Sequence, residues 1–403
     1  MDETIVIKDK EEKKPSKKLG KKWLILLICG IVGILAGIAC FLVVFLQPKA
    51  EIEALDFPEI PSKAESETNY SLLTGKALAD GANKNAPVFC IQTPNGTDGA
   101  RPQSGLTEAG VIFEAIAEAG ITRFAAIYQD PTSAVIGPIR SLRLYYLEWD
   151  TPFDCTIVHA GGADDAIAAL RSGGYRNFDE NYQYMYRGTY GSRLWNNLFI
   201  TSKQLKQFNT DQGYSSSDLK GFARMTPEES EKARVDDLVS EKIEITTPTD
   251  EDTSKLEAKV ESISLRFGNV PNFNVDYEYN AEKNAYERSY QSGVAHQVYS
   301  CSAEDLGERN PEDVCSLTTL SPSVVIAMVV QERRAADNYH ENITAVGSGD
   351  AYIFQNGTVI KGSWNKSSRA DQIKFLGGDG KEVLLAPGQT IVSAIPNYGS
   401  VEY

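Results

Sequence analysis

The sequence predicts a mixed α/β (α+β) protein, with a single N-terminal transmembrane helix, then an α/β domain and a mostly-β C-terminal domain. Three observations carry this prediction: an uncharged apolar run over residues 23–46, apolar runs alternating with helix-like segments over 85–233, and turn dipeptides between alternating strands over 243–403. Strands that alternate with helices are typical of an α/β layer, whereas Asn-Gly turns are typical of antiparallel hairpins.

The apolar run over residues 23–46 is long enough to cross a bilayer. As a helix it would measure about 36 Å, against a hydrocarbon core of ~30 Å. Lysines 17, 18, 21 and 22 precede the run, and only Lys49 follows it closely. This asymmetry predicts a cytoplasmic tail over residues 1–22 and a cell-membrane protein whose ectodomain is extracytoplasmic.

A cleaved N-terminal signal is the alternative to a retained anchor. A secretory signal has an apolar stretch of only ~7–15 residues, which is shorter than the run observed here. Residues 37–40, Gly-Ile-Ala-Cys, hint at a lipoprotein signal but lack Leu at the first position. Length and flanking charges therefore favour the membrane span.

The charge of the chain limits its partners. The net charge is −15, and residues 1–22 contribute +3, which leaves −18 for the remainder. An acidic ectodomain argues against binding to nucleic acid, so recognition of an anion would need a local cluster of arginines.

Four cysteines follow the membrane run. Cys301 and Cys315 bracket a polar loop, and we expect them to form a disulfide worth roughly 3 kcal/mol in the chain-entropy model. Cys90 and Cys155 fall within apolar runs, where they are buried either as free thiols or as a second pair.

Composition divides the part after the span. Residues 47–84 are rich in Glu, Ser, Pro and Ala and predict a stalk. The remaining length exceeds what one core usually supports, so we expect an α/β domain over 85–233, a linker over 234–242 and a β-rich domain over 243–403. Residues 107–119 show helical spacing, and Asn356-Gly357 predicts a type I′ turn between strands 351–355 and 358–364.

Several short segments resemble a known family. In the first half they are ARPQSGL (100–106), GITRF (120–124), GPIRSLR (137–143) and NLFITS (197–202). In the second half they are GSG (347–349), FQNG (354–357), GSW (362–364) and LAPGQ (385–389). Together they resemble the YerB-like bacterial envelope lipoprotein family, which pairs an N-terminal and a C-terminal domain of unknown function 3048. The resemblance implies an extracytoplasmic location in a bacterium and supplies no reaction. This chain departs from the family in its membrane run and in the insertion between Cys301 and Cys315.

Four arginines are the candidate ligand-binding residues: Arg101, Arg123, Arg140 and Arg143. Arg140 and Arg143 stand three apart at a predicted helix start, where free backbone N–H groups also favour an anion. Guanidinium groups bind carboxylate or phosphate through paired hydrogen bonds. The structural alternative is that these arginines pair with nearby acids such as Glu108, Glu114 and Glu118.

His159 and Asp164 are the candidate catalytic residues, although no catalytic set is complete. They flank a Gly-Gly turn after a predicted strand, and His159 is the one histidine of its domain. His159 would act as acid or base with Asp164 as its orienting partner. The alternative is a plain turn with Asp164 capping a helix. We expect no metal site and no cofactor, because histidines and cysteines lack ligand spacing.

We therefore expect a membrane-anchored envelope protein that binds rather than catalyses. Its partner would be an anionic peptide, a glycan fragment or an envelope protein, with tyrosines and tryptophans between residues 145 and 195 forming an aromatic face. One alternative is a hydrolase or transferase acting on peptidoglycan or another glycan through His159 and the arginines. Another is a substrate-capturing subunit of a transporter, which would need a deep cleft.

Overall fold

The computed structural model describes residues 70–189, 194–234, 259–301 and 309–403, all within one compact unit that runs from Glu67 to Tyr403. The predicted tail (1–22), the membrane run (23–46) and most of the stalk (47–84) lie outside the described residues. None of the helices in the described part of the chain combines the length and apolarity that a bilayer span requires.

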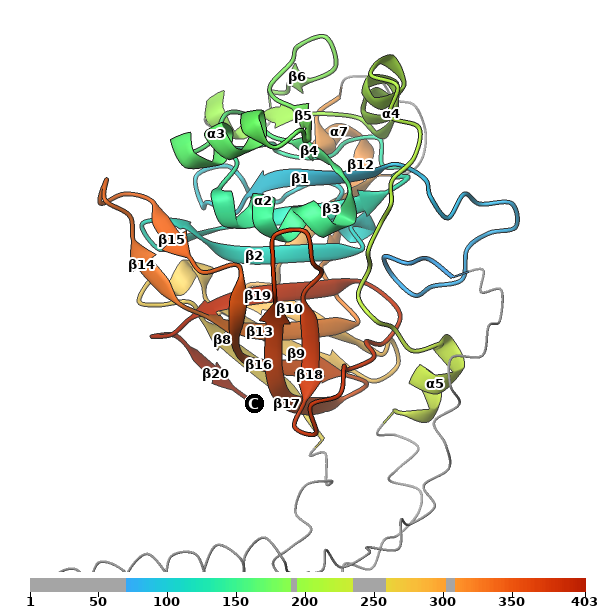
Figure 1. Ribbon diagram of the computed structural model, residues 1–403, viewed down its shortest axis with the longest axis vertical. Helices are drawn as coiled ribbons and strands as arrows, with labels where there is room; N and C mark the ends of the chain where they lie inside the picture. The colour runs from blue at the N-terminus through green and yellow to red at the C-terminus, as the bar shows by residue number, and fades with distance from the viewer. Residues whose placement is uncertain (1–69, 190–193, 235–258, 302–308) are drawn as a thin grey trace, which may run out of the picture. The chain divides into compact units, whose positions relative to one another are not determined.

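A ten-stranded sheet forms the centre of the unit (Figure 1). Its strand order is β18-β17-β16-β13-β19-β2-β3-β1-β4-β5. The strands are β1 (Val88–Pro94), β2 (Val111–Glu118), β3 (Ile121–Gln129), β4 (Thr156–Val158), β5 (Arg176–Phe178), β13 (Val324–Val330), β16 (Gly347–Gln355), β17 (Thr358–Lys366), β18 (Lys374–Gly377) and β19 (Thr390–Pro396).

The two predicted domains share this sheet. Strand β19 pairs in parallel with β2, with Ile391 opposite Ile112 and Val392 opposite Phe113. Every residue of both strands is buried, so each must be covered on both faces and cannot remain at a sheet edge. Segments 85–233 and 243–403 therefore do not have separate hydrophobic cores, because strand pairing joins them in one sheet.

A second, four-stranded sheet packs on the part of the large sheet built by the C-terminal segment. Its order is β10-β9-β8-β20, and its apolar side chains form one cluster with those of the large sheet. The strands are β8 (Ser262–Arg266), β9 (Val275–Asn280), β10 (Ala285–Tyr290) and β20 (Ser400–Glu402). Three hairpins are β6 (Tyr186–Arg187) with β7 (Leu198–Phe199), β11 (Gln297–Cys301) with β12 (Cys315–Thr319), and β14 (Glu332–Arg334) with β15 (Glu341–Ile343).

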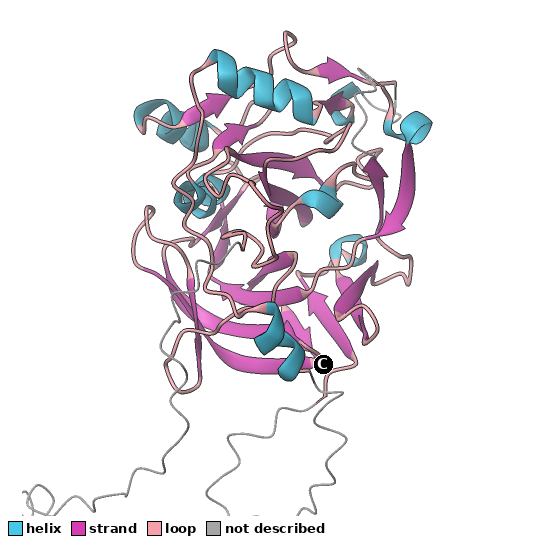
Figure 2. Ribbon diagram, turned by 90° about the vertical axis from the view of Figure 1, so that its right-hand side faces the viewer, coloured by secondary structure: helices cyan, strands magenta, loops and turns pink. Residues whose placement is uncertain are grey.

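The helices are short, and most gather around strands β1 to β5 (Figure 1), so that most of the cyan ribbon lies in the upper part of Figure 2. The α-helices are α2 (Leu144–Asp150), α3 (Asp164–Ser172), α4 (Ser202–Asp211), α5 (Pro227–Lys232) and α7 (Pro311–Val314). Single 3-10 turns are η1 (Leu106–Glu108), η2 (Thr151–Phe153), η3 (Leu194–Asn196) and η4 (Pro271–Phe273). Helix α4 begins at a capping box in which the Thr201 hydroxyl accepts from the Gln204 N–H and the Gln204 side chain accepts from the Thr201 N–H.

The predicted helix over 107–119 is wrong, because strand β2 occupies 111–118. Its residues are apolar at nearly every position, so helical spacing is met by chance in a strand that is buried on both faces. Val111, Ile112 and Ile116 are β-branched, which favours the strand. The Asn356-Gly357 hairpin forms as predicted, with Gln355 opposite Thr358 and both turn residues at positive φ.

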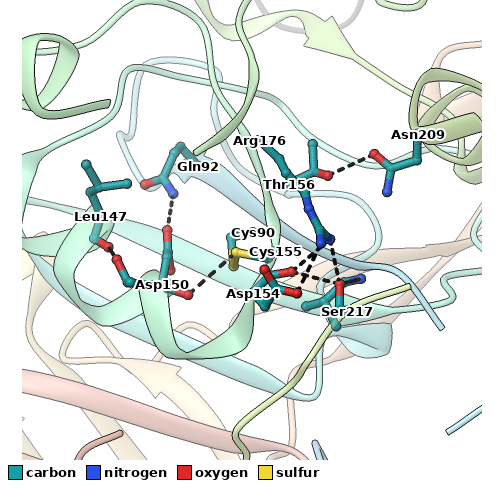
Figure 3. Close-up of a disulfide and its surroundings, with 12 residues drawn as sticks. Cys90, Gln92, Leu147, Asp150, Asp154, Cys155, Thr156, Arg176, Asn209 and Ser217 are labelled. Carbon is teal, nitrogen blue, oxygen red and sulfur yellow. Dashed lines mark hydrogen bonds and ion pairs between the residues drawn. A yellow bond between two sulfur atoms is a disulfide. The ribbon is translucent and has the colours of Figure 1, made fainter. Parts of the chain in front are cut away.

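Two disulfides cross-link the unit. Cys301 and Cys315, the expected pair, join the ends of β11 and β12. Cys90 of β1 is bonded to Cys155, which directly precedes β4 (Figure 3). Beside this second disulfide the buried Asp150 accepts a hydrogen bond of 3.0 Å from Gln92, and burial raises the pKa of Asp150 well above its ordinary value.

Candidate functional site

Two of the four candidate arginines share one carboxylate. Glu118, at the end of β2, lies 2.8 Å from an Nη2 of Arg123 and 2.6 Å from the Nη2 of Arg143. All three side chains are nearly buried. Burial favours the neutral acid, but the guanidinium groups of Arg123 and Arg143 hold the pKa of Glu118 below its ordinary value. Arg123 and Arg143 therefore pair with a nearby acid, which was the structural alternative to ligand binding.

Arg101 is also engaged within the protein. Its Nε–H donates to Asn95 Oδ1 at 2.8 Å and its Nη2 donates to the carbonyl of Asn272 at 3.0 Å. The guanidinium carbon lies 3.7 Å from the centre of the Tyr290 ring, a close cation–π contact. Arg101 thus links the loop after β1 to the C-terminal segment.

Arg140 differs from the other three. Its buried Nε lacks a partner, as do those of Arg123 and Arg143, but its Nη groups also form no hydrogen bond or ion pair with any described residue. Its backbone is nevertheless fixed, because the N–H donates to the carbonyl of Gln92 at 2.7 Å and the carbonyl accepts from Ala160 at 3.0 Å. Burial lowers the pKa of Arg140, and the carboxylates of Glu118 and Asp98 oppose that shift.

Two cavities meet at Arg140 and Trp195, and together we call them the Arg140 groove. The first measures about 320 Å³. Its other walls include Asn95, Asp98, Glu118, Thr122, Arg123, Asn196 and Tyr339. The second measures about 410 Å³, and its other walls are Ile139, Ala160, Glu180, Arg187 and Leu198. Both volumes lie in the range of small-molecule sites.

Two exposed aromatic side chains line the first cavity together with Arg140. Trp195 is 47% exposed, and its Nε1–H donates to Asp98 Oδ2 at 3.1 Å, which fixes the indole ring. Tyr339 is 53% exposed and lies in the loop between β14 and β15. That loop is held by a bridge between Glu118 and His340. The groove therefore needs both segments of the chain.

His159 and Asp164 do not form the expected catalytic pair. His159 is buried, with Nδ1 2.8 Å from the carbonyl of Gly161 and Nε2 2.8 Å from Asn177 Oδ1. The nearest carboxylate to its ring is Asp179 at 3.5 Å, in the position predicted for Asp164. His159 lines none of the three cavities described in this section. Each ring nitrogen already has a protein partner, so the ring stabilises the turn at Gly161 and its contact with β5.

Asp164 lines a third cavity, of about 400 Å³, which residues of the β14–β15 hairpin also line. Its walls include Arg143, Asp165, Asp337, His340 and Glu341. The predicted set thus divides among separate places: Asp164 and Arg143 line this cavity, and Arg140 and Arg123 line the groove. Within the described ranges, no three His, Cys, Asp or Glu side chains are placed to hold a metal ion.

A buried polar cluster around Arg288 was not found from the sequence. The Arg288 guanidinium pairs with Glu114 at 2.9 Å, and both side chains are fully buried. Its Nη1 donates to the Tyr277 hydroxyl at 2.6 Å and its Nε donates to His296 Nδ1 at 2.9 Å. His296 Nε2 then donates to Gln103 Oε1 at 3.0 Å. Burial and the charge of Arg288 lower the pKa of His296, so the ring is neutral.

This cluster joins the two segments of the chain, because Glu114 and Arg288 are 174 positions apart in the sequence. Burial alone would lower the pKa of Arg288, but the charge of Glu114 together with the Tyr277 and Tyr290 hydroxyls raises that pKa above its ordinary value. No spacing in the sequence indicates such a pair, because its members lie on strands of different sheets.

Comparison with known proteins gives the same two segments. Residues 73–215 match the N-terminal domain, and residues 263–392 the C-terminal domain, of a family described as protein of unknown function (DUF3048). The candidate lipoprotein YerB of Bacillus subtilis (strain 168) is 27% identical over 334 residues, covering 81% of this chain and 86% of YerB. The crystal structure of the Bacillus subtilis YerB protein superposes with a TM-score of 0.64 at 21% identity, covering 83% of this chain and 99% of that one, and shows the same fold.

Proposed function

We propose that this chain, which belongs to the DUF3048 family through both of its domains, is a binding protein of the cell envelope. The family is described as one of unknown function. In the proposal, the protein holds an anionic ligand in the Arg140 groove. The ligand is bound without being transformed. The observation that carries the proposal is the guanidinium of Arg140, which has no partner among the described residues yet lines both cavities of the groove.

A half-buried cation without a partner costs free energy, because burial removes part of its hydration. Proteins usually offset this cost with a carboxylate, as Glu118 does for Arg123 and Arg143. A ligand carboxylate or phosphate would provide charge-assisted hydrogen bonds to Arg140, which are about twice as strong as neutral ones. The fixed backbone of Arg140 supports a preorganised site.

Binding is favoured over catalysis by the position of His159. Both nitrogens of its ring contact groups of the protein, and it lies outside the cavities that contain Arg140. Asp164 lines a different cavity. A general acid or base must lie within hydrogen-bond reach of the reacting atom, and neither residue meets that requirement in the groove.

Location at the outer face of the cell membrane is part of the same proposal. YerB, the Bacillus subtilis relative, carries the description of a candidate lipoprotein, which supports a membrane-held protein outside the cytoplasm. In this chain the apolar run 23–46 would supply the anchor in place of a lipid. Protease added to intact cells should digest the part after residue 46, and full protection of that part would contradict the proposed location.

The test of binding is thermal unfolding of the full-length chain with a panel of anions. The panel contains inorganic phosphate, a tetrasaccharide of uronic acid and tetra-aspartate. A ligand at 100 times its dissociation constant stabilises the folded state by about 2.7 kcal/mol, which raises the Tm by several degrees. Arg140→Ala should abolish the rise.

The matched control is Arg171→Ala. Arg171 is an exposed arginine in the last turn of α3 and lines none of the three cavities. Its removal changes the net charge equally and should leave the rise in Tm intact. If no member of the panel stabilises the wild-type chain, or if both variants lose the effect equally, the proposal is overturned.

A further inference from the structure

We infer that the ligand of the Arg140 groove is an acidic saccharide, in which a carboxylate contacts Arg140 and a sugar ring stacks on Trp195. This inference rests on the proposed function and specifies the ligand class for the same site. It depends on three features of the groove: exposed aromatic rings, accessible polar side chains, and two cavities that share Arg140 and Trp195.

The aromatic rings provide flat apolar surfaces in the same cavity as the cation. Trp195 and Tyr339 come from different segments of the chain, and about half of each residue is exposed. One face of a pyranose ring presents C–H groups that carry a slight positive charge, and an aromatic face is slightly negative. Stacking of this kind binds a sugar ring whether or not the sugar carries a charge.

The indole ring of Trp195 is held in place before any ligand binds. Asp98 accepts from Trp195 Nε1 at 3.1 Å and from Asn196 Nδ2 at 3.0 Å. Holding a platform in its bound orientation lowers the entropy cost of association. The exposure of Trp195 therefore belongs to an ordered surface.

The accessible polar side chains of the groove suit a ligand with hydroxyl groups. Asp98 in the first cavity and Glu180 and Arg187 in the second are at least partly exposed, whereas Asn95, Thr122 and Asn196 are buried and hydrogen-bonded within the protein. Carboxylates accept hydrogen bonds from hydroxyls, and a guanidinium donates to them. A saccharide offers more hydroxyls for such bonds than an acidic peptide does.

The position of Arg140 sets where the charge must lie on the ligand. Arg140 and Trp195 line both cavities, so a group bound to the cation lies next to both spaces. A ligand of more than one ring would place its acidic group at this point and extend toward Glu180 and Arg187 on one side. Those two residues are paired with each other at 2.6 Å, so they neutralise that end.

Peptide recognition relies mainly on added strands, apolar grooves or paired arginines. The groove has one unpartnered cation and two flat rings, which matches a charged sugar better than a polyanionic peptide. Peptides rich in acid would instead favour a site with several free cations.

The test compares three probes of equal length on the full-length chain by calorimetric titration: a uronic acid tetrasaccharide, a neutral glucose tetrasaccharide and tetra-aspartate. We expect the acidic saccharide to bind at least tenfold more tightly than either of the other two. Trp195→Ala should weaken its binding by on the order of tenfold, whereas Trp195→Phe, which keeps an aromatic face, should retain most of it. Tyr403→Ala removes an exposed aromatic side chain outside the groove and should change nothing.

The outcomes separate this inference from the proposed function. If tetra-aspartate binds more tightly than the acidic saccharide and depends on Arg140 but not on Trp195, the saccharide is overturned and the anion site stands. If the neutral saccharide binds as well as the acidic one and Arg140→Ala has no effect, the anion site fails as well. Equal loss in Trp195→Phe and Trp195→Ala at unchanged Tm would overturn stacking.

Discussion

The cluster around Arg288 and the groove around Arg140 use the same side chain in opposite surroundings. Arg288 is fully buried, and its Nε, Nη1 and Nη2 donate to His296, Tyr277 and Glu114. Arg140 is half-buried, and its guanidinium has no partner among the described residues. Both sites lie where the N-terminal and C-terminal segments meet.

The difference shows that the hydrogen-bond and ion-pair partners of an arginine indicate whether it stabilises the fold or can bind a ligand. A buried charge that is paired on every side contributes to specific packing of the two segments. A charge that is left open in a cavity keeps its hydrogen-bonding capacity for a ligand. Between the two lies Glu118, which satisfies Arg123 and Arg143 at the edge of the groove.

The largest expected effect comes from breaking the cluster around Arg288. Glu114→Ala leaves a buried guanidinium without its carboxylate, which should lower the free energy of unfolding by about 3–5 kcal/mol. Urea denaturation of the full-length chain measures this loss. The double variant Glu114→Gln/Arg288→Met removes both charges and should recover much of it. If Glu114→Ala unfolds like the wild type, the cluster does not hold the segments together.

A second expected effect is a pH dependence of the loop that walls the groove. Glu332 of β14 is almost fully buried, and burial raises its pKa to about 7, against an ordinary value of 4.5, although a hydrogen bond from Tyr398 lowers it. Glu341 beside it raises the pKa further, whereas Arg334 opposes the rise.

Because the folded-state pKa of Glu332 is above the unfolded value, its stabilising effect is complete below pH 4.5 and is lost as pH rises through 7. The loss amounts to up to about 3 kcal/mol, at 1.36 kcal/mol per unit of pKa. Hydrogen exchange of the β14–β15 amides between pH 5 and pH 8 should show faster opening, after correction for the intrinsic rate. Glu332→Gln should remove this pH dependence, and an unchanged profile would refute it.

A third expected effect comes from removing the carboxylate that Arg123 and Arg143 share. Glu118→Gln leaves Arg123 and Arg143 without their shared carboxylate, at a cost of about 2 kcal/mol in unfolding free energy. The same change makes the groove more positive, so binding of an anion should become tighter. Denaturation and titration on one preparation measure both quantities. Weaker anion binding in a folded Glu118→Gln chain would argue that Glu118 itself contacts the ligand.

The smallest effect on stability is expected for Arg140→Ala. It removes a cation without a partner, so the free energy of unfolding should change by less than about 0.5 kcal/mol. A loss above about 2 kcal/mol would show that Arg140 has a structural partner and belongs with the cluster around Arg288.

Local features of the fold were predictable from the sequence, whereas contacts between distant segments were not. The Asn356-Gly357 hairpin depends on two turn residues and adjacent strands, and it forms as predicted. The pair of Glu118 and Arg123 lies across the turn between β2 and β3, so their short spacing makes it foreseeable. The pairing of β2 with β19 depends on residues almost 280 positions apart, and no local pattern encodes it.

For the site, the sequence identified the arginines but not which of them has no partner. Arg101 bonds to Asn272 and Arg143 to Glu118 through contacts between separated segments, whereas Arg123 pairs with Glu118 across a turn. Tyr339 lay outside the predicted aromatic face, because it reaches the groove from the other segment. The exposure of both rings beside the cation is visible only in three dimensions.

The most direct measurement is of the Nη–H resonances of Arg140 in the full-length chain labelled with ¹⁵N-arginine, assigned by their loss in Arg140→Lys. In the free protein these N–H groups should exchange rapidly with water, whereas those of Arg288, which are bonded to Tyr277 and Glu114, should be protected. Addition of the uronic acid tetrasaccharide should shift and protect the Arg140 signal and leave the Arg288 signal unchanged. A signal of Arg140 that is already protected without ligand, or that does not respond while those of Arg123 and Arg143 do, would contradict the account.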